Sequence, residues 1–181
     1  MLSQVQRRKL TKMFRYLDGD RDDVLVRGDY DRMCGALLGV LEPDPGSPEA
    51  AEIAASYAFE WSELEADASR DGGRAVTLEL WLAYRARKLA PADAYETEIA
   101  PYVETVVALL DRDRDGRLSA AEVRRYLGLY RMREDELDEI LGKIDPGRRG
   151  SFAREEILAL ARDYYFSSDE SAPGSWLLGR F

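Results

Sequence analysis

The segment that most constrains the fold runs from Asp111 to Glu122 and reads DRDRDGRLSAAE. Carboxylates stand at its first, third and fifth positions, a glycine follows at the sixth, and a glutamate closes it at the twelfth. In a loop that doubles back on itself, alternate residues point inward, so these carboxylates converge while Arg112 and Arg114 point outward. The glycine supplies the positive φ that the turn needs. The pattern predicts a calcium site in a loop between two helices.

Calcium takes six to eight oxygen ligands, and each position of such a loop has a set role. Carboxylates bind from positions one, three and five, a backbone carbonyl binds from position seven, and position nine often acts through water. A bidentate glutamate enters from the following helix at position twelve. The expected ligands in this loop are Asp111, Asp113, Asp115, the Arg117 carbonyl, Ser119 and Glu122.

A related loop spans residues 18–29 and reads DGDRDDVLVRGD. Asp23 replaces the glycine at position six, where aspartate tolerates left-handed backbone at a modest cost. Val26 offers no side-chain oxygen at position nine, and Asp29 is one methylene shorter than glutamate. Fewer ligands in a tighter shell favour magnesium relative to calcium, so we expect a divalent ion here with magnesium tolerated. The expected ligands are Asp18, Asp20, Asp22, the Val24 carbonyl and Asp29.

Two further loops have the spacing of metal sites without their ligands. Loop 69–80 offers Ser69, Asp71 and Gly73 at the first three ligand positions and has Leu80 at the twelfth. An irregular loop from Asp67 to Glu79 is an alternative, although it shifts Val76 out of register. We expect a scaffold without metal.

Loop 145–156 reads DPGRRGSFAREE and keeps Asp145 and Glu156 at its first and last positions. Gly147 and Arg149 stand where the other two carboxylates belong. A guanidinium directed at the cavity is a competing cation. We therefore expect no tight metal binding in this loop.

All four loops share an apolar residue at position eight and lie between helical periodicities. Neighbouring loops of this kind pair through a short β contact at that position, so Leu25 should face Val76, and Leu118 should face Phe152. The fold class predicted is all-α, with four EF-hand helix-loop-helix units in two pairs. The expected divisions are an N-terminal pair over 1–90, a C-terminal pair over 91–166 and an apolar tail over 167–181 that packs on the core.

Composition narrows the function of the 181-residue chain. It contains no histidine, which removes the commonest nucleophile pairs and any imidazole ligand, so no enzymatic role is expected. A net charge of −9 disfavours nucleic acid and suits cations. No apolar run approaches the ~20 residues of a membrane span. The start of the chain lacks the apolar centre of a signal peptide, so a cytoplasmic monomer is expected, and no protein partner is indicated.

The chain resembles the sarcoplasmic calcium-binding protein family, in particular its bacterial calerythrin-like branch. The resemblance rests on the four loops at similar spacing, the long connector in the first pair and the closing segment SSDESAPGSWLLGRF. Tails of the form SDD…APGNWLFG are typical of the family. The matching residues are Ser168, Asp169, Ala172, Pro173, Gly174, Trp176, Leu177 and Gly179. The resemblance implies two EF-hand pairs packed together, two or three working sites, and a role in calcium buffering or transport.

Two functions fit the sequence. The first is a calcium buffer or transporter that holds two ions, with the apolar tail filling the groove that a target would use. The alternative is a calcium sensor that exposes this groove to a protein partner. The chain has only four methionines, and they are scattered, unlike the Met-rich surfaces of promiscuous sensors. The buffer is therefore the leading hypothesis.

Overall fold

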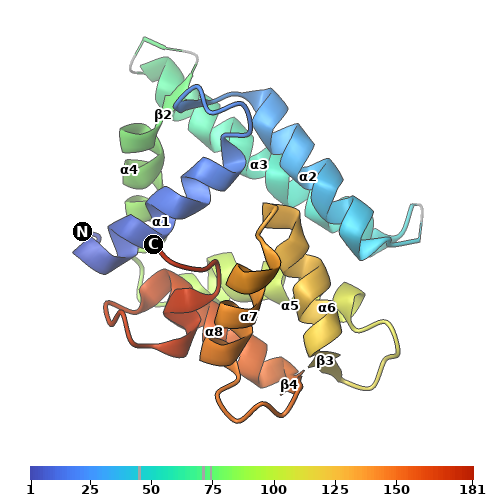
Figure 1. Ribbon diagram of the computed structural model, residues 1–181. Coiled ribbons are helices and arrows are strands. Elements are labelled where there is room, and N and C mark those ends of the chain that lie inside the picture. The colour runs from blue at the N-terminus through green and yellow to red at the C-terminus, as the bar shows by residue number, and fades with distance from the viewer. Residues whose placement is uncertain (45, 71, 74) are drawn as a thin grey trace.

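Helices joined by polar loops make up most of the molecule (Figure 1). The computed structural model describes residues 1–181 except Pro45, Asp71 and Arg74. Among the described residues the α-helices are α1 (Gln4–Leu17), α2 (Arg27–Leu41), α3 (Pro48–Arg70), α4 (Leu78–Lys88), α5 (Ala100–Leu110), α6 (Ala120–Leu127), α7 (Glu134–Ile144) and α8 (Arg154–Phe166). Shorter turns are η1 (Tyr95–Ile99, π-helical), η2 (Gly128–Tyr130) and η3 (Pro173–Trp176). None of the described helices is long and apolar enough to cross a membrane.

Short antiparallel strands join the loops in pairs. Strand β1 (Val24–Leu25) pairs with β2 (Val76–Thr77), and β3 (Arg117–Ser119) pairs with β4 (Ser151–Ala153). Leu25 lies opposite Val76, and Leu118 lies opposite Phe152. All four side chains are buried. The all-α prediction and the two predicted strand contacts are therefore confirmed.

Buried side chains form two clusters, and one of them combines residues from both halves of the sequence. One cluster gathers residues of α1 and α4 with the start of α2 and the end of α3, around Trp61 and Trp81. The other contains the C-terminal helices together with Leu37 and Leu41 of α2 and Ile53 of α3. In Figure 1 the long antiparallel pair α2 and α3 extends from the first EF-hand pair over α5 and α6. Helices α2 and α3 therefore join the two halves.

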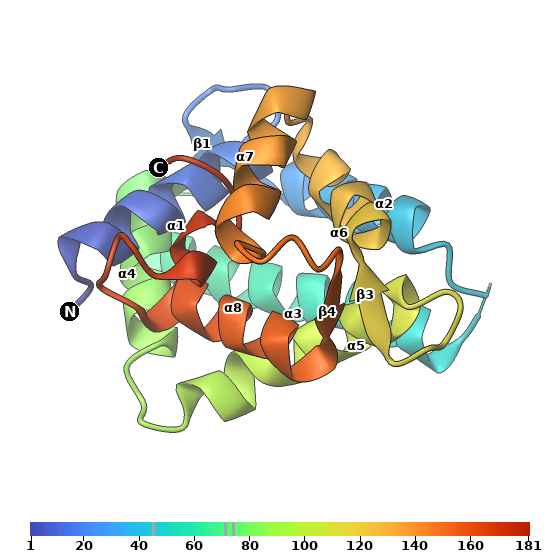
Figure 2. The same cartoon turned by 60° about the horizontal axis from the view of Figure 1, so that its bottom comes forward.

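The C-terminal segment lies against the helices and does not extend into solvent. Turn η3 packs on α8 and α7, and Figure 2 shows the chain continuing between α7 and α1. Leu178 is 3% exposed and belongs to the C-terminal cluster. At Gly174 any Cβ would lie 2.2 Å from the Leu160 carbonyl oxygen, so only glycine allows this approach to α8.

A buried lysine fixes this segment to the first helix. The Lys9 ammonium donates hydrogen bonds to the Asp163 carbonyl (2.8 Å), the Ser167 carbonyl (2.9 Å) and the Ser175 hydroxyl (3.2 Å). The Lys9 and Ser175 side chains are completely buried. Desolvation lowers the pKa of Lys9 from 10.5 to about 8, although the charge of Asp163 opposes this shift.

The buried lysine predicts a pH dependence of stability. Between about pH 8 and pH 10.5 the unfolded chain keeps a proton on Lys9 that the folded chain has lost, so the contribution of this residue to stability rises with pH. Below pH 8 both states are protonated and the contribution is constant. We expect the difference in unfolding free energy between the wild type and Lys9→Met to grow by on the order of 2 kcal/mol across this window, measured by urea denaturation.

The matched control is Lys143→Met, at an exposed lysine. Its pH profile should parallel that of the wild type. Parallel profiles for the wild type and Lys9→Met would show that the buried amine does not titrate in this window.

Candidate metal centre

Two of the loops bring three aspartates together. Asp18, Asp20 and Asp22 form one group, and Asp111, Asp113 and Asp115 form the other. Within each group every residue offers a carboxylate oxygen, and these oxygens lie within 4.8 Å of one another. Carboxylate oxygens at this spacing are the ligands that calcium and magnesium prefer. Six of the eleven predicted ligands are thus gathered into two groups.

The first aspartate of each loop also holds the backbone in shape. Asp111 accepts hydrogen bonds from the N–H groups of Asp115 (3.1 Å) and Gly116 (2.9 Å). Asp18 accepts the equivalent bonds from Asp22 (3.2 Å) and Asp23 (3.1 Å). The two loops therefore share the same turn, in spite of their different residues at position six.

The turn places position six in the left-handed region in both loops. Gly116 has φ of 79°, and Asp23 has φ of 66°. Left-handed backbone costs about 1–2 kcal/mol for an ordinary L-residue, and aspartate is among the residues that tolerate it best. The absence of glycine thus leaves the geometry of loop 18–29 intact.

The carboxylates at position twelve lie outside the aspartate groups and close each loop onto its own backbone. Glu122 accepts hydrogen bonds from the N–H groups of Arg112 (3.1 Å) and Ser119 (2.8 Å). Asp29 accepts the matching bonds from Gly19 (3.3 Å) and Val26 (3.1 Å). The shorter aspartate therefore reaches the same two positions as glutamate.

The remaining predicted ligands lie on the strands. Val24 is in β1 and Arg117 is in β3, which places their backbone carbonyls at position seven of the two loops. The Arg117 side chain turns away and donates to the Ser151 hydroxyl (3.1 Å). The Ser119 hydroxyl donates to Glu122 (2.8 Å), so position nine contacts position twelve directly.

Mutual repulsion within the two aspartate groups contributes to raised pKa values of their carboxylates. The Asp115 N–H group stabilises the Asp113 carboxylate, but desolvation and the charge of Asp115 outweigh it and raise the pKa of Asp113. Desolvation and the charge of Asp22 likewise raise the pKa of Asp20. In contrast, desolvation of Glu122 is outweighed by the Ser119 and Arg112 N–H groups, which lower its pKa. A divalent cation would relieve this repulsion, so both groups fit such an ion.

Loop 18–29 has a neighbour that sequence reasoning missed. The Arg32 guanidinium lies 3.5 Å from Asp29 Oδ1 and also donates to the Leu17 carbonyl oxygen. It therefore places a positive charge beside the carboxylate that closes the loop. The i,i+3 spacing of Asp29 and Arg32 on α2 is the signal that could have revealed it.

Loop 145–156 contains its own cation. Arg149 contacts both remaining carboxylates, with Nε 3.4 Å from Asp145 and Nη1 2.7 Å from Glu156. The Gly150 N–H group and Arg149 lower the pKa of Asp145, and the Ala153 N–H group and Arg149 lower that of Glu156. The guanidinium thus occupies the position between ligands one and twelve where it was expected to compete with a metal.

Loop 69–80 has no carboxylate at its twelfth position, and in the alternative register the carboxylates at both ends are already paired. Asp71 lies outside the described residues, and the Leu80 side chain packs against the N-terminal cluster. In the alternative register, Asp67 is paired with Arg70 (2.6 Å) and Arg87 (2.8 Å). Glu79 is paired with Arg7 (2.6 Å). These arginines neutralise both ends of the alternative loop.

Comparison with known proteins agrees with this architecture. No family model matches the chain. Calerythrin from Saccharopolyspora erythraea is 22% identical over 170 residues, which cover 92% of this chain and 95% of calerythrin. A Streptomyces coelicolor calcium-binding protein, described as acting in calcium-mediated regulation, superposes with a TM-score of 0.64 at 24% identity, over 91% of this chain and 99% of that one.

An animal protein shares the fold over its full length. The sarcoplasmic calcium-binding protein from amphioxus superposes with a TM-score of 0.66 at 18% identity and covers 100% of both chains. At this identity the likeness concerns the fold, whereas the likeness to calerythrin concerns the sequence along almost the whole chain. With four helix-loop-helix units in two strand-linked pairs, the chain has the EF-hand fold of the sarcoplasmic calcium-binding proteins and is similar in sequence to calerythrin.

Proposed function

We propose that the protein binds two divalent cations, calcium at loop 111–122 and calcium or magnesium at loop 18–29, and acts as a calcium buffer or transporter. One observation carries the proposal: in the described part of the chain, three aspartates converge in these two loops. The names of the Streptomyces and amphioxus neighbours, both calcium-binding proteins, agree with it.

The bound ion supplies no chemistry beyond neutralising and ordering the loop. In loop 111–122 its ligands are the three aspartates, the Arg117 carbonyl, Ser119 and Glu122. In loop 18–29 they are the three aspartates, the Val24 carbonyl and Asp29. Because Arg149 already neutralises loop 145–156, calcium entering loop 111–122 meets a partner loop that takes up no ion. Cooperativity within a pair, which needs two ions, should therefore be weak.

The C-terminal segment favours a buffer over a sensor. Leu178 is buried in the C-terminal cluster, and its carbonyl oxygen accepts a bond from the Tyr16 hydroxyl (3.4 Å). A sensor must release such a segment to expose apolar surface to a target. Calcium-mediated regulation by the Streptomyces neighbour keeps the sensor as the second candidate.

Removing the ligand at position twelve should abolish one site. With Glu122→Gln, calorimetric titration with calcium should report one ion in place of two, because the neutral amide cannot provide a bidentate carboxylate. The matched control is Glu156→Gln, at the same position of loop 145–156, which should still take up two ions. Two ions bound with unchanged affinity by the Glu122 variant would contradict the assignment.

Lengthening the ligand of the first loop should change its metal preference. Asp29→Glu adds the methylene that bidentate binding of calcium favours, so the calcium-over-magnesium preference of loop 18–29 should rise roughly tenfold, or about 1.4 kcal/mol. Calcium titrations with and without excess magnesium measure this ratio. Asp31→Glu, two residues further along α2, is the control and should leave it unchanged. An unaltered ratio for Asp29→Glu would rule out Asp29 as a ligand.

Hydrogen exchange separates the buffer from the sensor. Because the tail is packed and held by Lys9, backbone amides in residues 173–181 should exchange slowly both with calcium and with a chelator. Mass spectrometry of the peptides from this segment measures the rates, and peptides from loop 111–122 provide the positive control for ion binding. Loss of protection in the tail on adding calcium would favour the sensor.

A further inference from the structure

The molecule contains a partly open cavity of about 480 Å³ between its two halves. Its walls come from α1, α3, α5, α6, α8 and the C-terminal segment, with part of the lining from α2, α4 and η1. Pockets that bind small molecules have volumes of about 300–1,000 Å³ and are mostly apolar with a few polar groups. This cavity has that size, and apart from Leu118 its lining lies outside the metal loops.

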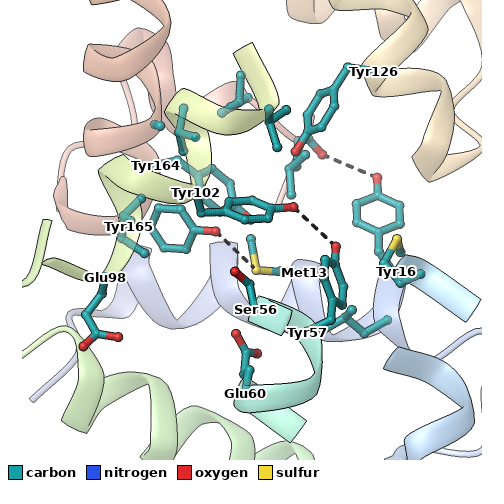
Figure 3. Close-up of a pocket in the computed structure, with 18 of the residues that line it drawn as sticks. Met13, Tyr16, Ser56, Tyr57, Glu60, Glu98, Tyr102, Tyr126, Tyr164 and Tyr165 are labelled. Atoms are coloured by element: carbon teal, nitrogen blue, oxygen red, sulfur yellow. Dashed lines mark hydrogen bonds between the residues drawn. The ribbon is translucent and has the colours of Figure 1, made fainter. Parts of the chain in front are cut away.

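Tyrosines dominate the polar part of the wall. The chain has 10 tyrosines, and all except Tyr95 line the cavity: Tyr16, Tyr30, Tyr57, Tyr84, Tyr102, Tyr126, Tyr130, Tyr164 and Tyr165. Valine, leucine and isoleucine side chains complete most of the lining. Figure 3 shows the Tyr57 and Tyr102 hydroxyls turned toward each other, with Tyr165 turned toward Met13. The cavity therefore combines flat aromatic faces with several hydroxyl groups.

The tyrosine hydroxyls of the cavity have more donor protons than there are hydrogen-bond acceptors for them among the described residues. The Tyr57 and Tyr102 oxygens lie 3.4 Å apart, and those of Tyr126 and Tyr130 lie 3.2 Å apart. A tyrosine hydroxyl donates one hydrogen bond, so each pair leaves one proton without an acceptor among the described residues. Within residues 1–181 other than 45, 71 and 74, the Tyr165 hydroxyl has one hydrogen-bond acceptor, the Met13 sulfur at 3.9 Å, and thioether sulfur is a weak acceptor.

A further unsatisfied donor lies on the same wall. The Nε–H group of Arg85 is buried and has no hydrogen-bond partner among the described residues. Unpaired buried donors cost about 1–3 kcal/mol each, and a ligand oxygen could remove this cost. Burial also raises the pKa of Tyr57, Tyr102 and Tyr130 well above the usual value, so these hydroxyls stay protonated donors at neutral pH.

Charged groups on the wall are already paired with one another. Arg85 lies 2.5 Å from Glu60, which also accepts a hydrogen bond from Tyr30 (2.5 Å). Lys88 lies 2.7 Å from Glu98. The described residues of the lining thus offer no unbalanced charge to an ionic ligand, which would have to lose its hydration without compensation.

We propose that this cavity is a binding site for a neutral, largely aromatic organic molecule carrying carbonyl or ether oxygens. Its aromatic body packs on the tyrosine rings and the aliphatic side chains, and its oxygens accept the tyrosine protons that have no acceptor within the described part of the chain. The cavity walls include Leu177 and Leu178, so the C-terminal segment forms one side of the site. The inference does not depend on metal binding.

The test uses prodan, a neutral naphthalene ketone whose emission shifts to the blue in apolar surroundings, titrated into the full-length protein in excess calcium. We expect saturable binding of one molecule with a blue shift. The double variant Tyr57→Phe, Tyr102→Phe keeps the rings and removes one hydroxyl pair, so the affinity should fall about fivefold. The matched control is Tyr95→Phe, at the tyrosine outside the cavity, which should bind with wild-type affinity.

A second variant tests the location independently of hydrogen bonding. Val103→Trp adds a large ring to a residue of the wall and should abolish saturable binding. Far-ultraviolet circular dichroism establishes that each variant is folded; if the tryptophan variant is not, the phenylalanine pair decides. Absence of saturable binding to the wild type, or wild-type affinity in the phenylalanine pair, would overturn the proposal.

Discussion

Compensation of negative charge inside a tight loop is the constraint on which the structure depends. The carboxylates of three aspartates, whose oxygens lie within 4.8 Å of one another, repel each other. The loop offsets this repulsion by directing backbone N–H groups at the carboxylates of positions one and twelve, Asp111 and Glu122 in loop 111–122. Where only two carboxylates remain, Arg149 joins them. Loop 145–156 thus keeps the EF-hand shape with an internal cation, while loops 18–29 and 111–122 retain a charge imbalance that an external cation can relieve.

The strands and helices that depend on the spacing of nearby residues could be predicted from the sequence. The apolar residues at position eight predicted both strand contacts, and helical periodicity predicted the helices. The role of Arg149 followed from its position in the loop. These features were accessible because a 12-residue loop dictates which side chains point inward, whatever the rest of the chain does.

Features built from distant residues could not be predicted in this way. In the sequence Lys9 is one of several basic residues of the first helix. In the structure it is buried against residues that lie more than 150 positions away in the sequence. The tyrosines of the cavity come from helices throughout the chain, and periodicity shows only that they face inward. Inward-facing side chains can either fill the interior or leave a cavity, depending on how the two halves pack. A cavity is the small difference between the interior volume and the volume of the side chains that fill it, so it cannot be read from the sequence.

Leu118 belongs to two parts of the molecule at once. In β3 it lies opposite Phe152 and stands between the proposed ligands Arg117 and Ser119, and its side chain also forms part of the cavity wall. A rearrangement of this strand on ion binding would therefore alter the shape of the cavity. Linkage between two binding sites is reciprocal. If calcium changes the affinity of the cavity for an occupant by some factor, the occupant therefore changes the affinity for calcium by the same factor. The amount of calcium held would then report on the supply of a second molecule.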